Sequence, residues 1–284
     1  MIITTCGNSV SIAKAIAKKV KAKFSPLTVE SFPDGDIYLK FNTPVKGKKV
    51  VIVQSFQPNS DMSLFDIVFA GETAKGLGAK KVILVAPYLA YMRQDTRFHA
   101  GEAISSRIMA KLLNNSVDKI ITIDPHLHRY KSLKDIFSIS AKKLTANGII
   151  AEYVKNKVKN AVIIGPDWES YQWAEEIAKE VNCNVTVFEK KRQSSRHVTE
   201  VMKKPIPIQG KNVVIIDDII STGHTIAEAA KKARKLGAKS VAAICVHGLF
   251  VENAIDKMKK AGVSKIVSTN CIEHKTNSID VTPL

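Results

Sequence analysis

Short β-branched runs alternate with amphipathic segments along the whole chain, and this alternation constrains the fold more than any other feature. The amphipathic segments are rich in Ala, Lys and Leu. Short apolar runs of this kind are typical of strands buried on both faces of a parallel sheet, and the segments between them are typical of covering helices. The sequence therefore predicts an α/β fold of mainly parallel sheets flanked by helices, with strands at residues 50–53, 82–86, 120–123, 162–164, 185–188, 213–216 and 241–246.

An internal repeat divides the chain into two halves. The run at residues 48–53 leads to a helical segment that ends in Leu-Gly-Ala-Lys, and the run at residues 211–216 leads to one that ends in the same four residues. Gly78 and Gly237, within these endings, fit the residue just past a helix end, where a positive φ is needed. A length of 284 residues also suits two domains of moderate size. We therefore expect two related domains, residues 1–146 and 147–284, and the last few residues are candidates for a return to the first domain.

The most specific stretch of the chain follows the strand predicted at residues 213–216. Two adjacent carboxylates, Asp217 and Asp218, precede a short loop of small hydroxyl residues around Gly223 and an Ala-rich helical segment. Ligands of open α/β sheets bind at the carboxyl ends of strands, and the N–H groups of a helix N-terminus favour a phosphate. Because the acidic pair is placed to hold sugar hydroxyls, or a metal bound to them, the stretch predicts a phosphorylated sugar as the ligand. The first half has Gln-Ser at residues 54–55 instead, so we expect the site to belong mainly to the second domain.

Charge and composition limit the other classes of function. The formal net charge of +17 favours a nucleic-acid partner, but the Lys residues are spread over several helical segments and aromatic residues make up only 6%. We therefore expect solvated helix faces and no nucleic-acid partner. No apolar run is long enough for a membrane span, and four scattered cysteines without a CxxC pair indicate a reducing cytoplasm. Neither GxxxxGK[ST] nor GxGxxG occurs, which argues against a Walker or Rossmann nucleotide site.

Residues 217–225, Asp-Asp-Ile-Ile-Ser-Thr-Gly-His-Thr, resemble the 5-phosphoribosyl 1-diphosphate loop shared by phosphoribosyltransferases and ribose-phosphate pyrophosphokinases. The resemblance implies two phosphoribosyltransferase-like domains and a loop that holds the sugar 5-phosphate while the acids face the ribose diol. Many members carry an acid where this chain has Ser221, so Ser221 is assigned no acid–base role. The ribose 5-phosphate-binding residues implied in this way are Arg192, Asp217, Asp218, Ser221, Thr222, Gly223, His224 and Thr225.

Two stretches of the first half are similar to ATP-binding segments of ribose-phosphate pyrophosphokinases. Residues 88–95 resemble a segment whose Arg-Gln pair contacts ATP, and residues 31–36 resemble an adenine-binding loop in which Phe32 is placed to stack on the base. The usual Glu of that loop is Asp36 here, which has a shorter reach. In family members this loop reaches into a neighbouring subunit's site, which implies a homo-oligomer with a shared ATP site. The ATP-binding residues implied are Phe32, Asp34, Gly35, Asp36, Arg93, Gln94, Asp95 and Arg97.

Metal and catalytic residues are also implied by resemblance to this family. An Asp-x-His segment assigns His126 as a Mg²⁺ ligand, and a Gly-Pro-Asp segment assigns Asp167 as the second. Magnesium prefers oxygen ligands, so the chemistry of His126 alone suggests zinc. The segment from residue 188 to 205 resembles the family's mobile catalytic loop, which implies Lys190 and Arg192 as catalytic residues. In an extended segment these two residues, two apart, share one face.

The motifs occur in the family's order and span most of the chain, so the resemblance extends to the activity of archaeal-type ribose-phosphate pyrophosphokinases. That activity transfers the β,γ-diphosphoryl group of ATP to the anomeric hydroxyl of ribose 5-phosphate, with Mg²⁺, and serves nucleotide biosynthesis. It proceeds by in-line attack on the β-phosphorus, assisted by charge neutralisation. Three alternatives stay open at this point. A nucleobase phosphoribosyltransferase shares residues 217–225 but needs no ATP segments, and a non-catalytic regulatory homologue keeps the fold. The basic composition also leaves a nucleic-acid binder, whose association would be tight and would depend steeply on salt.

Overall fold

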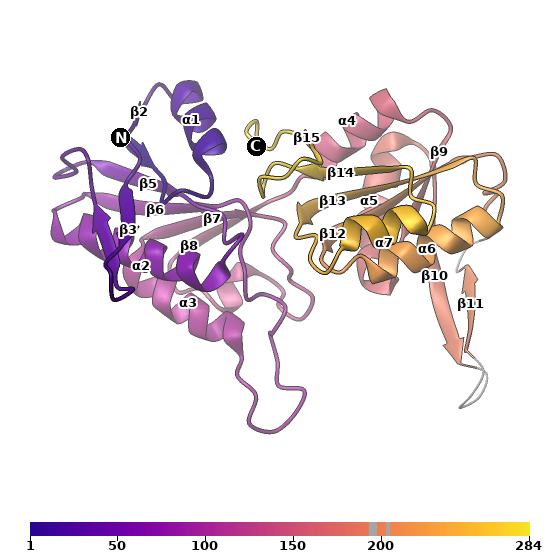
Figure 1. Cartoon of the computed structure of the whole chain (residues 1–284), viewed down its shortest axis with the longest axis horizontal. Helices are drawn as coiled ribbons and strands as arrows, with labels where there is room; N and C mark the ends of the chain where they lie inside the picture. Colours follow the sequence, from indigo (N-terminus) through magenta and orange to yellow (C-terminus); the bar gives the residue numbers. More distant parts are fainter. Residues whose placement is uncertain (193–197, 203–204) are drawn as a thin grey trace. The chain divides into compact units, whose positions relative to one another are not determined.

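The computed structural model describes residues 1–192, 198–202 and 205–284, with the backbone alone at residues 169, 189–192 and 198–202. The chain forms two compact α/β units (Figure 1). Among the described helices, none combines the length and the apolar character that crossing a membrane requires. The first unit comprises Met1–Thr145, Cys271–Glu273 and Thr282–Leu284, and the second comprises Ala146–Asn270 and His274–Val281.

The first unit is built on a six-stranded sheet in the order β2-β1-β5-β6-β7-β8, in which every neighbouring pair is parallel. Its strands are β1 (Ile2–Thr4), β2 (Lys23–Phe24), β5 (Lys49–Val53), β6 (Lys81–Ala86), β7 (Lys119–Ile123) and β8 (Ser140–Leu144). Helix α1 (Val10–Lys19) covers one face, and α2 (Ser60–Gly76) and α3 (Ser105–Ser116) pack together on the other (Figure 1). The central β5 has no exposed surface at Ile52 and Val53, as expected for a strand covered on both faces.

Two short additions to this unit carry residues of interest. Strands β3 (Thr28–Ser31) and β4 (Ile37–Lys40) form a separate antiparallel hairpin, and η1 (Leu133–Asp135) is a single 3₁₀ turn between β7 and β8. The hairpin turn consists of the predicted adenine-binding residues. The structure thus presents that segment at the tip of an arm rather than within the main sheet.

The second unit is built on a seven-stranded sheet in the order β11-β10-β9-β12-β13-β14-β15, parallel except for the β10–β11 pair. Its strands are β9 (Ala161–Gly165), β10 (Asn184–Arg192), β11 (Val198–Met202), β12 (Asn212–Ile220), β13 (Ser240–Gly248), β14 (Lys265–Thr269) and β15 (Asn277–Ile279). Its helices are α4 (Asn147–Lys157), α5 (Trp168–Val181), α6 (His224–Lys235) and α7 (Ala254–Lys260).

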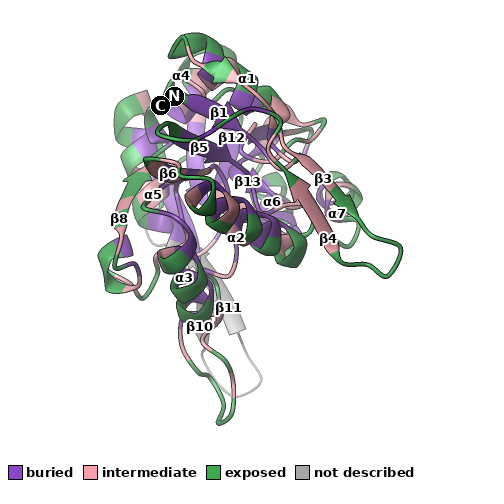
Figure 2. Ribbon diagram, turned by 90° about the vertical axis from the view of Figure 1, so that its left-hand side faces the viewer, coloured by how far each residue is buried: buried purple, intermediate pink, exposed green. Residues whose placement is uncertain are grey.

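Helices α4 and α5 pack together against this sheet, as do α6 and α7. Val213 and Ile215 of β12 share a buried cluster with the alanines of α6 and with Met258 of α7. The intervening Val214 and Ile216 are also fully buried. Because side chains alternate across a strand, β12 is covered on both faces (Figure 2).

The internal repeat is also a structural repeat. Gly78 and Gly237 each follow a helix end with φ of +79° and +81°, which confirms the prediction made for both residues. Each carbonyl accepts from the N–H of a second positive-φ glycine, which lies just before the strand that leads into that helix. The distances are 2.7 Å from Gly47 to Gly78 and 2.8 Å from Gly210 to Gly237. The same hydrogen bond therefore joins the loop before the strand to the loop after the helix in both units.

Two elements run further than the sequence predicted. The strand expected to end at residue 216 continues to Ile220, and Asp217 lies opposite Cys245 in the ladder with β13. The aliphatic residues after the acidic pair, together with the length of β13, extend this pairing. Strand β10 likewise continues to Arg192, antiparallel to β11, where the resemblance implied a mobile catalytic loop. Neighbouring strands thus order segments that carry no strong pattern of their own.

Candidate functional site

Three carboxylates gather at the carboxyl end of the second sheet. Asp217 and Asp218 are half-buried in β12, where the Asp218 N–H donates to Asp217 Oδ1 at 3.1 Å and the Ile219 N–H donates to Asp218 Oδ1 at 2.7 Å. Burial, followed by the negative charges of Asp218 and Asp167, raises the pKa of Asp217 well above its ordinary value. Such a cluster is stabilised by hydroxyl donors or by a cation. The arrangement therefore suits a polyhydroxylated ligand, a metal, or both.

The loop after β12 is shaped as an anion-binding turn. Gly223 has a φ of +69° and precedes α6, and no side chain caps this helix. The first N–H groups of a helix have no carbonyl partner within it, so they are available to a phosphate. A Cβ on Gly223 would lie 3.1 Å from Met258 Cγ and 3.2 Å from Ala254 O. Both the backbone angle and the close packing therefore require glycine here.

The hydroxyl residues of this loop differ in exposure. Ser221 and Thr222 are half-buried, whereas His224 and Thr225 are exposed. The ring Nε2 of His224 lies 3.3 Å from Glu228 Oε1, one turn along α6. The structure thus brings the predicted residues from Asp217 to Thr225 into one strand–loop–helix corner.

Asp167, predicted as a metal ligand, is the N-cap of α5. Its Oδ1 accepts from the Ser170 N–H at 3.0 Å, and its own N–H donates to Ser170 Oγ at 3.3 Å, which completes a capping box. A carboxylate at a helix N-terminus also interacts favourably with the helix dipole. Asp167 therefore has a structural role besides the charge that it adds to the carboxylate cluster.

In the first unit, the predicted ATP segment at residues 93–97 is held by local contacts. Asp95 has no exposed side-chain surface, and its Oδ1 accepts from Arg129 Nη1 at 2.7 Å. Arg97 Nε donates to the Glu102 carbonyl at 2.7 Å, and the side chains of Arg93 and Arg97 are both exposed. The Asp95 carboxylate is thus engaged by the protein, and the two arginines are exposed cations of the segment.

Gln94 joins this segment to the start of α3. Its side-chain Oε1 accepts from the Ser105 hydroxyl. Its carbonyl accepts from the Ser106 N–H at 3.3 Å and from the Ser106 hydroxyl at 3.2 Å. Tyr130 also contacts Ser106, with 2.8 Å between their hydroxyl oxygens. The segment therefore rests on α3 and on the loop after β7.

The hairpin tip exposes an aromatic ring, and two acidic residues and a glycine follow it in the turn. Phe32 is 51% exposed and packs edge-to-face on Tyr38, with 5.6 Å between ring centroids. The turn is closed by the Gly35 N–H, which donates to the Phe32 carbonyl at 2.8 Å, and by the Asp36 N–H, which lies 3.3 Å from Asp34 Oδ1. An exposed ring on a closed turn is suited to stacking on a planar base.

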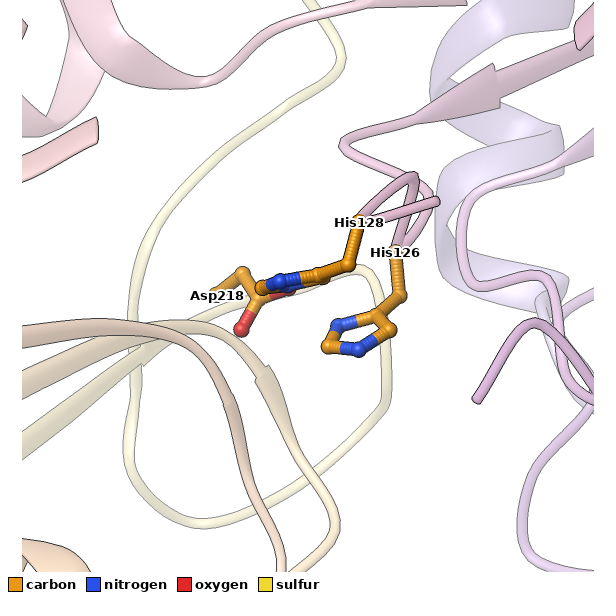
Figure 3. A group of neighbouring side chains, drawn as sticks. All are labelled: His126, His128 and Asp218. Carbon is orange, nitrogen blue, oxygen red and sulfur yellow. The ribbon is translucent and has the colours of Figure 1, made fainter. Parts of the chain in front are cut away.

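The loop after β7 places two histidines side by side. The rings of His126 and His128 have centroids 3.7 Å apart and are tilted by 33° (Figure 3). His126 is half-buried and His128 is exposed. Figure 3 also draws the side chain of Asp218, which comes from β12 of the second unit.

The two predicted catalytic residues lie outside the described side chains. The backbone of Lys190 and Arg192 belongs to β10, opposite Glu200 and Val198 of β11. Sequence reasoning missed Arg129, which pairs with Asp95, and Lys257, which donates to the Thr222 carbonyl at 3.0 Å. The position of Arg129 directly after the His-x-His segment was a usable signal.

Comparisons with known proteins agree with this architecture from end to end. A family model described as the N-terminal domain of ribose phosphate pyrophosphokinase matches residues 1–116, and one described as the phosphoribosyl transferase domain matches residues 132–284. The chain is 35% identical to a ribose-phosphate pyrophosphokinase of Methanothermobacter thermautotrophicus, over 100% of this chain and 98% of the relative. It is 36% identical to ribose-phosphate pyrophosphokinase 2 of Archaeoglobus fulgidus, with the same coverage of both chains.

A solved structure shares the fold. The crystal structure of phosphoribosylpyrophosphate synthetase from Mycobacterium smegmatis superimposes with a TM-score of 0.87, covering 99% of this chain and 95% of that one. The two sequences are 23% identical. This likeness confirms the predicted α/β fold with two phosphoribosyltransferase-like sheets.

Proposed function

The chain belongs to the ribose-phosphate pyrophosphokinase family (EC 2.7.6.1), and from this premise we propose which substrate each part of the chain binds and how the reaction proceeds. The proposed reaction transfers the β,γ-diphosphoryl group of ATP to the anomeric hydroxyl of ribose 5-phosphate. The products are 5-phosphoribosyl 1-diphosphate and AMP. The observation that carries the proposal is the likeness to curated pyrophosphokinases over the full length of the chain.

The corner between β12 and α6 is assigned to ribose 5-phosphate. Ser221, Thr222 and the N–H groups around Gly223 hold the 5-phosphate, as the helix N-terminus favours. Asp217 and Asp218 accept hydrogen bonds from the ribose hydroxyls. Because two neighbouring carboxylates repel each other, hydroxyl donors bound between them lower the energy of the bound state.

The first unit is assigned to ATP. The exposed Phe32 ring is suited to the adenine base, and the planar guanidinium of Arg93 is suited to phosphate oxygens. Asp34 and Asp36 are acceptors for the edge of the base or for the ribose. In this proposal Asp95, Arg97 and Gln94 act chiefly by shaping the segment that presents Arg93, because each of them makes a side-chain hydrogen bond within the protein.

The carboxylates of the second unit also fit Mg²⁺. Asp167, Asp217 and Asp218 offer the oxygen donors that magnesium prefers, and burial, followed by the negative charges of Asp218 and Asp167, raises the pKa of Asp217. The resemblance adds His126 to Asp167 as a ligand, and both remain in the proposal. Bound Mg²⁺ would supply neutralisation of the phosphate charge.

Lys190 and Arg192 supply further positive charge around the phosphates, in addition to that of Mg²⁺. Attack on the β-phosphorus places the ribose oxygen in line with the departing AMP oxygen. Positioning of the reactants and neutralisation of charge therefore provide most of the rate acceleration. Two cations from one segment reduce the charge around the transferred group. We assign no strong general base, since none of the described residues stands out for that role.

The proposal is tested by AMP release from ATP, measured with and without ribose 5-phosphate. We expect release that depends on the sugar phosphate, and a loss of kcat on the order of 10²–10³-fold in Lys190→Ala. A nucleobase phosphoribosyltransferase would instead form a nucleotide from a base and 5-phosphoribosyl 1-diphosphate. A regulatory homologue would show no turnover with Mg²⁺. A near-normal kcat in Lys190→Ala would contradict the assigned role of that residue.

A further inference from the structure

The connection between β13 and α7 holds the outer side of the phosphate loop. The N–H groups of Leu249 and Phe250 donate to the Ile220 carbonyl at 2.9 and 3.1 Å, and the Val251 N–H donates to the Ser221 carbonyl at 3.1 Å. Two successive carbonyls of the loop are therefore fixed by one neighbouring segment.

The next carbonyl of the loop is held by a side chain. Lys257, half-buried on α7, places its Nζ 3.0 Å from the carbonyl oxygen of Thr222. Hydrogen bonds from a charged donor are stronger than those between neutral groups. The bond joins α7 to the residue directly before Gly223, where the loop turns into α6.

These contacts determine where the N–H groups of the loop point. In a planar trans peptide unit, the carbonyl and the N–H of the following residue point in opposite directions. With the carbonyls of residues 220–222 turned toward the β13–α7 segment, the N–H groups of Ser221, Thr222 and Gly223 point the other way. Successive N–H groups aligned in this manner form an anion-binding concavity, and the carbonyls that would repel an anion face away from it.

The supporting segment itself adopts an unusual backbone. Phe250, Glu252 and Asn253 have φ values of +46°, +52° and +58°. This region is disfavoured for residues other than glycine, and such conformations persist only where the surrounding structure enforces them. The Ala254 N–H, which donates to the Val251 carbonyl at 3.0 Å, ties the segment to α7.

We propose that Lys257 is a positioning residue for ribose 5-phosphate, which acts by fixing the Thr222–Gly223 peptide with its N–H toward the 5-phosphate. This inference rests on the proposed function, because it assumes that the loop binds that phosphate. The other donors to the loop carbonyls are backbone groups, whereas the donor of Lys257 can be removed by substitution. Lys257 does not touch the substrate, so its effect falls on binding of the sugar phosphate and not on ATP.

The test is Lys257→Met, which keeps the length of the side chain and removes the donor. Calorimetry with ribose 5-phosphate alone is expected to show binding about tenfold weaker than in the wild type, as for loss of one charge-assisted hydrogen bond. Lys257→Arg, which keeps a charged donor, is expected to bind within about twofold of the wild type. The matched control is Lys260→Met, an exposed lysine of the same helix, which is expected to leave affinity unchanged.

Two readouts separate this role from other effects. The KM for ATP is expected to stay within about twofold of the wild type in Lys257→Met, whereas the KM for ribose 5-phosphate rises with the dissociation constant. Unchanged affinity in Lys257→Met, or an equal loss in Lys260→Met, would overturn the proposal. Failure of the proposed reaction gives a different result, because ribose 5-phosphate would then bind in a Lys257-dependent way without AMP release.

Discussion

Asp66 is a buried carboxyl in the first unit with a perturbed proton affinity. It is 7% exposed, its Oδ1 has no hydrogen-bond partner among the described residues, and burial raises its pKa from 3.8 to about 6. Between these values the unfolded chain releases the proton while the folded chain keeps it. The stability that this group contributes is therefore fully present below pH 4 and is lost as the pH rises to about 6.

Asp66→Asn is expected to remove this loss. Relative to the wild type, its free energy of unfolding should increase between pH 4 and 6 by roughly 2–3 kcal/mol and stay level above that range, since one pKa unit is worth about 1.4 kcal/mol. Urea unfolding at a series of pH values measures the difference. Glu72→Gln, an exposed acid on the same helix, is the control. A difference that does not vary with pH would contradict the account.

Site residues could be predicted from the sequence where they lie close together in one short stretch of the chain. The stretch from Asp217 to Thr225 places carboxylates, hydroxyls and glycine together because they are neighbours in the chain. The Asp95–Arg129 pair spans 34 positions, and neither residue alone indicates its partner. Asp167 was predicted as a metal ligand from the resemblance of its Gly-Pro-Asp segment, but its capping of α5 depends on backbone geometry that the residue type does not specify.

The corner between β12 and α6 depends on Gly223 through both backbone angle and packing. Gly223→Ala should lower the affinity for ribose 5-phosphate about tenfold and destabilise the second unit by about 2 kcal/mol, because a Cβ there lies 3.1 Å from Met258 Cγ. Gly210→Ala is the matched control, since its φ of +71° is similar and nothing lies within 4 Å of its Cβ. It should cost only about 1 kcal/mol and leave the affinity unchanged. Equal effects of the two substitutions would contradict the packing argument.

At the scale of elements, the longer aliphatic strands were predictable, whereas the fully buried β1 has only three residues and was not predicted. The seven predicted strands correspond to β5, β6, β7, β9, β10, β12 and β13, which carry aliphatic runs. Strand β8, by contrast, reads Ser-Ala-Lys-Lys-Leu and lies at a sheet edge, where solvent accepts polar side chains. Such strands form because a neighbour offers hydrogen bonds, and that information is not local.

At the scale of the whole molecule, the proposed shared ATP site makes a direct prediction about mixed oligomers. Phe32→Ala and Lys190→Ala subunits should each be nearly inactive alone, because one lacks the proposed base-stacking ring and the other lacks a proposed catalytic cation. If the hairpin serves a neighbouring subunit, co-refolded mixtures regain activity in hybrid sites, to about a quarter of the wild type for a two-fold dimer mixed at random. Phe32→Ala mixed with wild type is the control for dilution. No gain above the sum of the separate activities would contradict a shared site.

The central claim is that ATP loses its β,γ-diphosphoryl group to ribose 5-phosphate, and labelled ATP tests it most directly. With label in the γ-phosphate, the account predicts that radioactivity moves into the phosphoribosyl product. With label in the α-phosphate, it predicts that radioactivity remains in AMP. Label from the γ-position recovered as inorganic phosphate, with ADP as the other product, would contradict the claim.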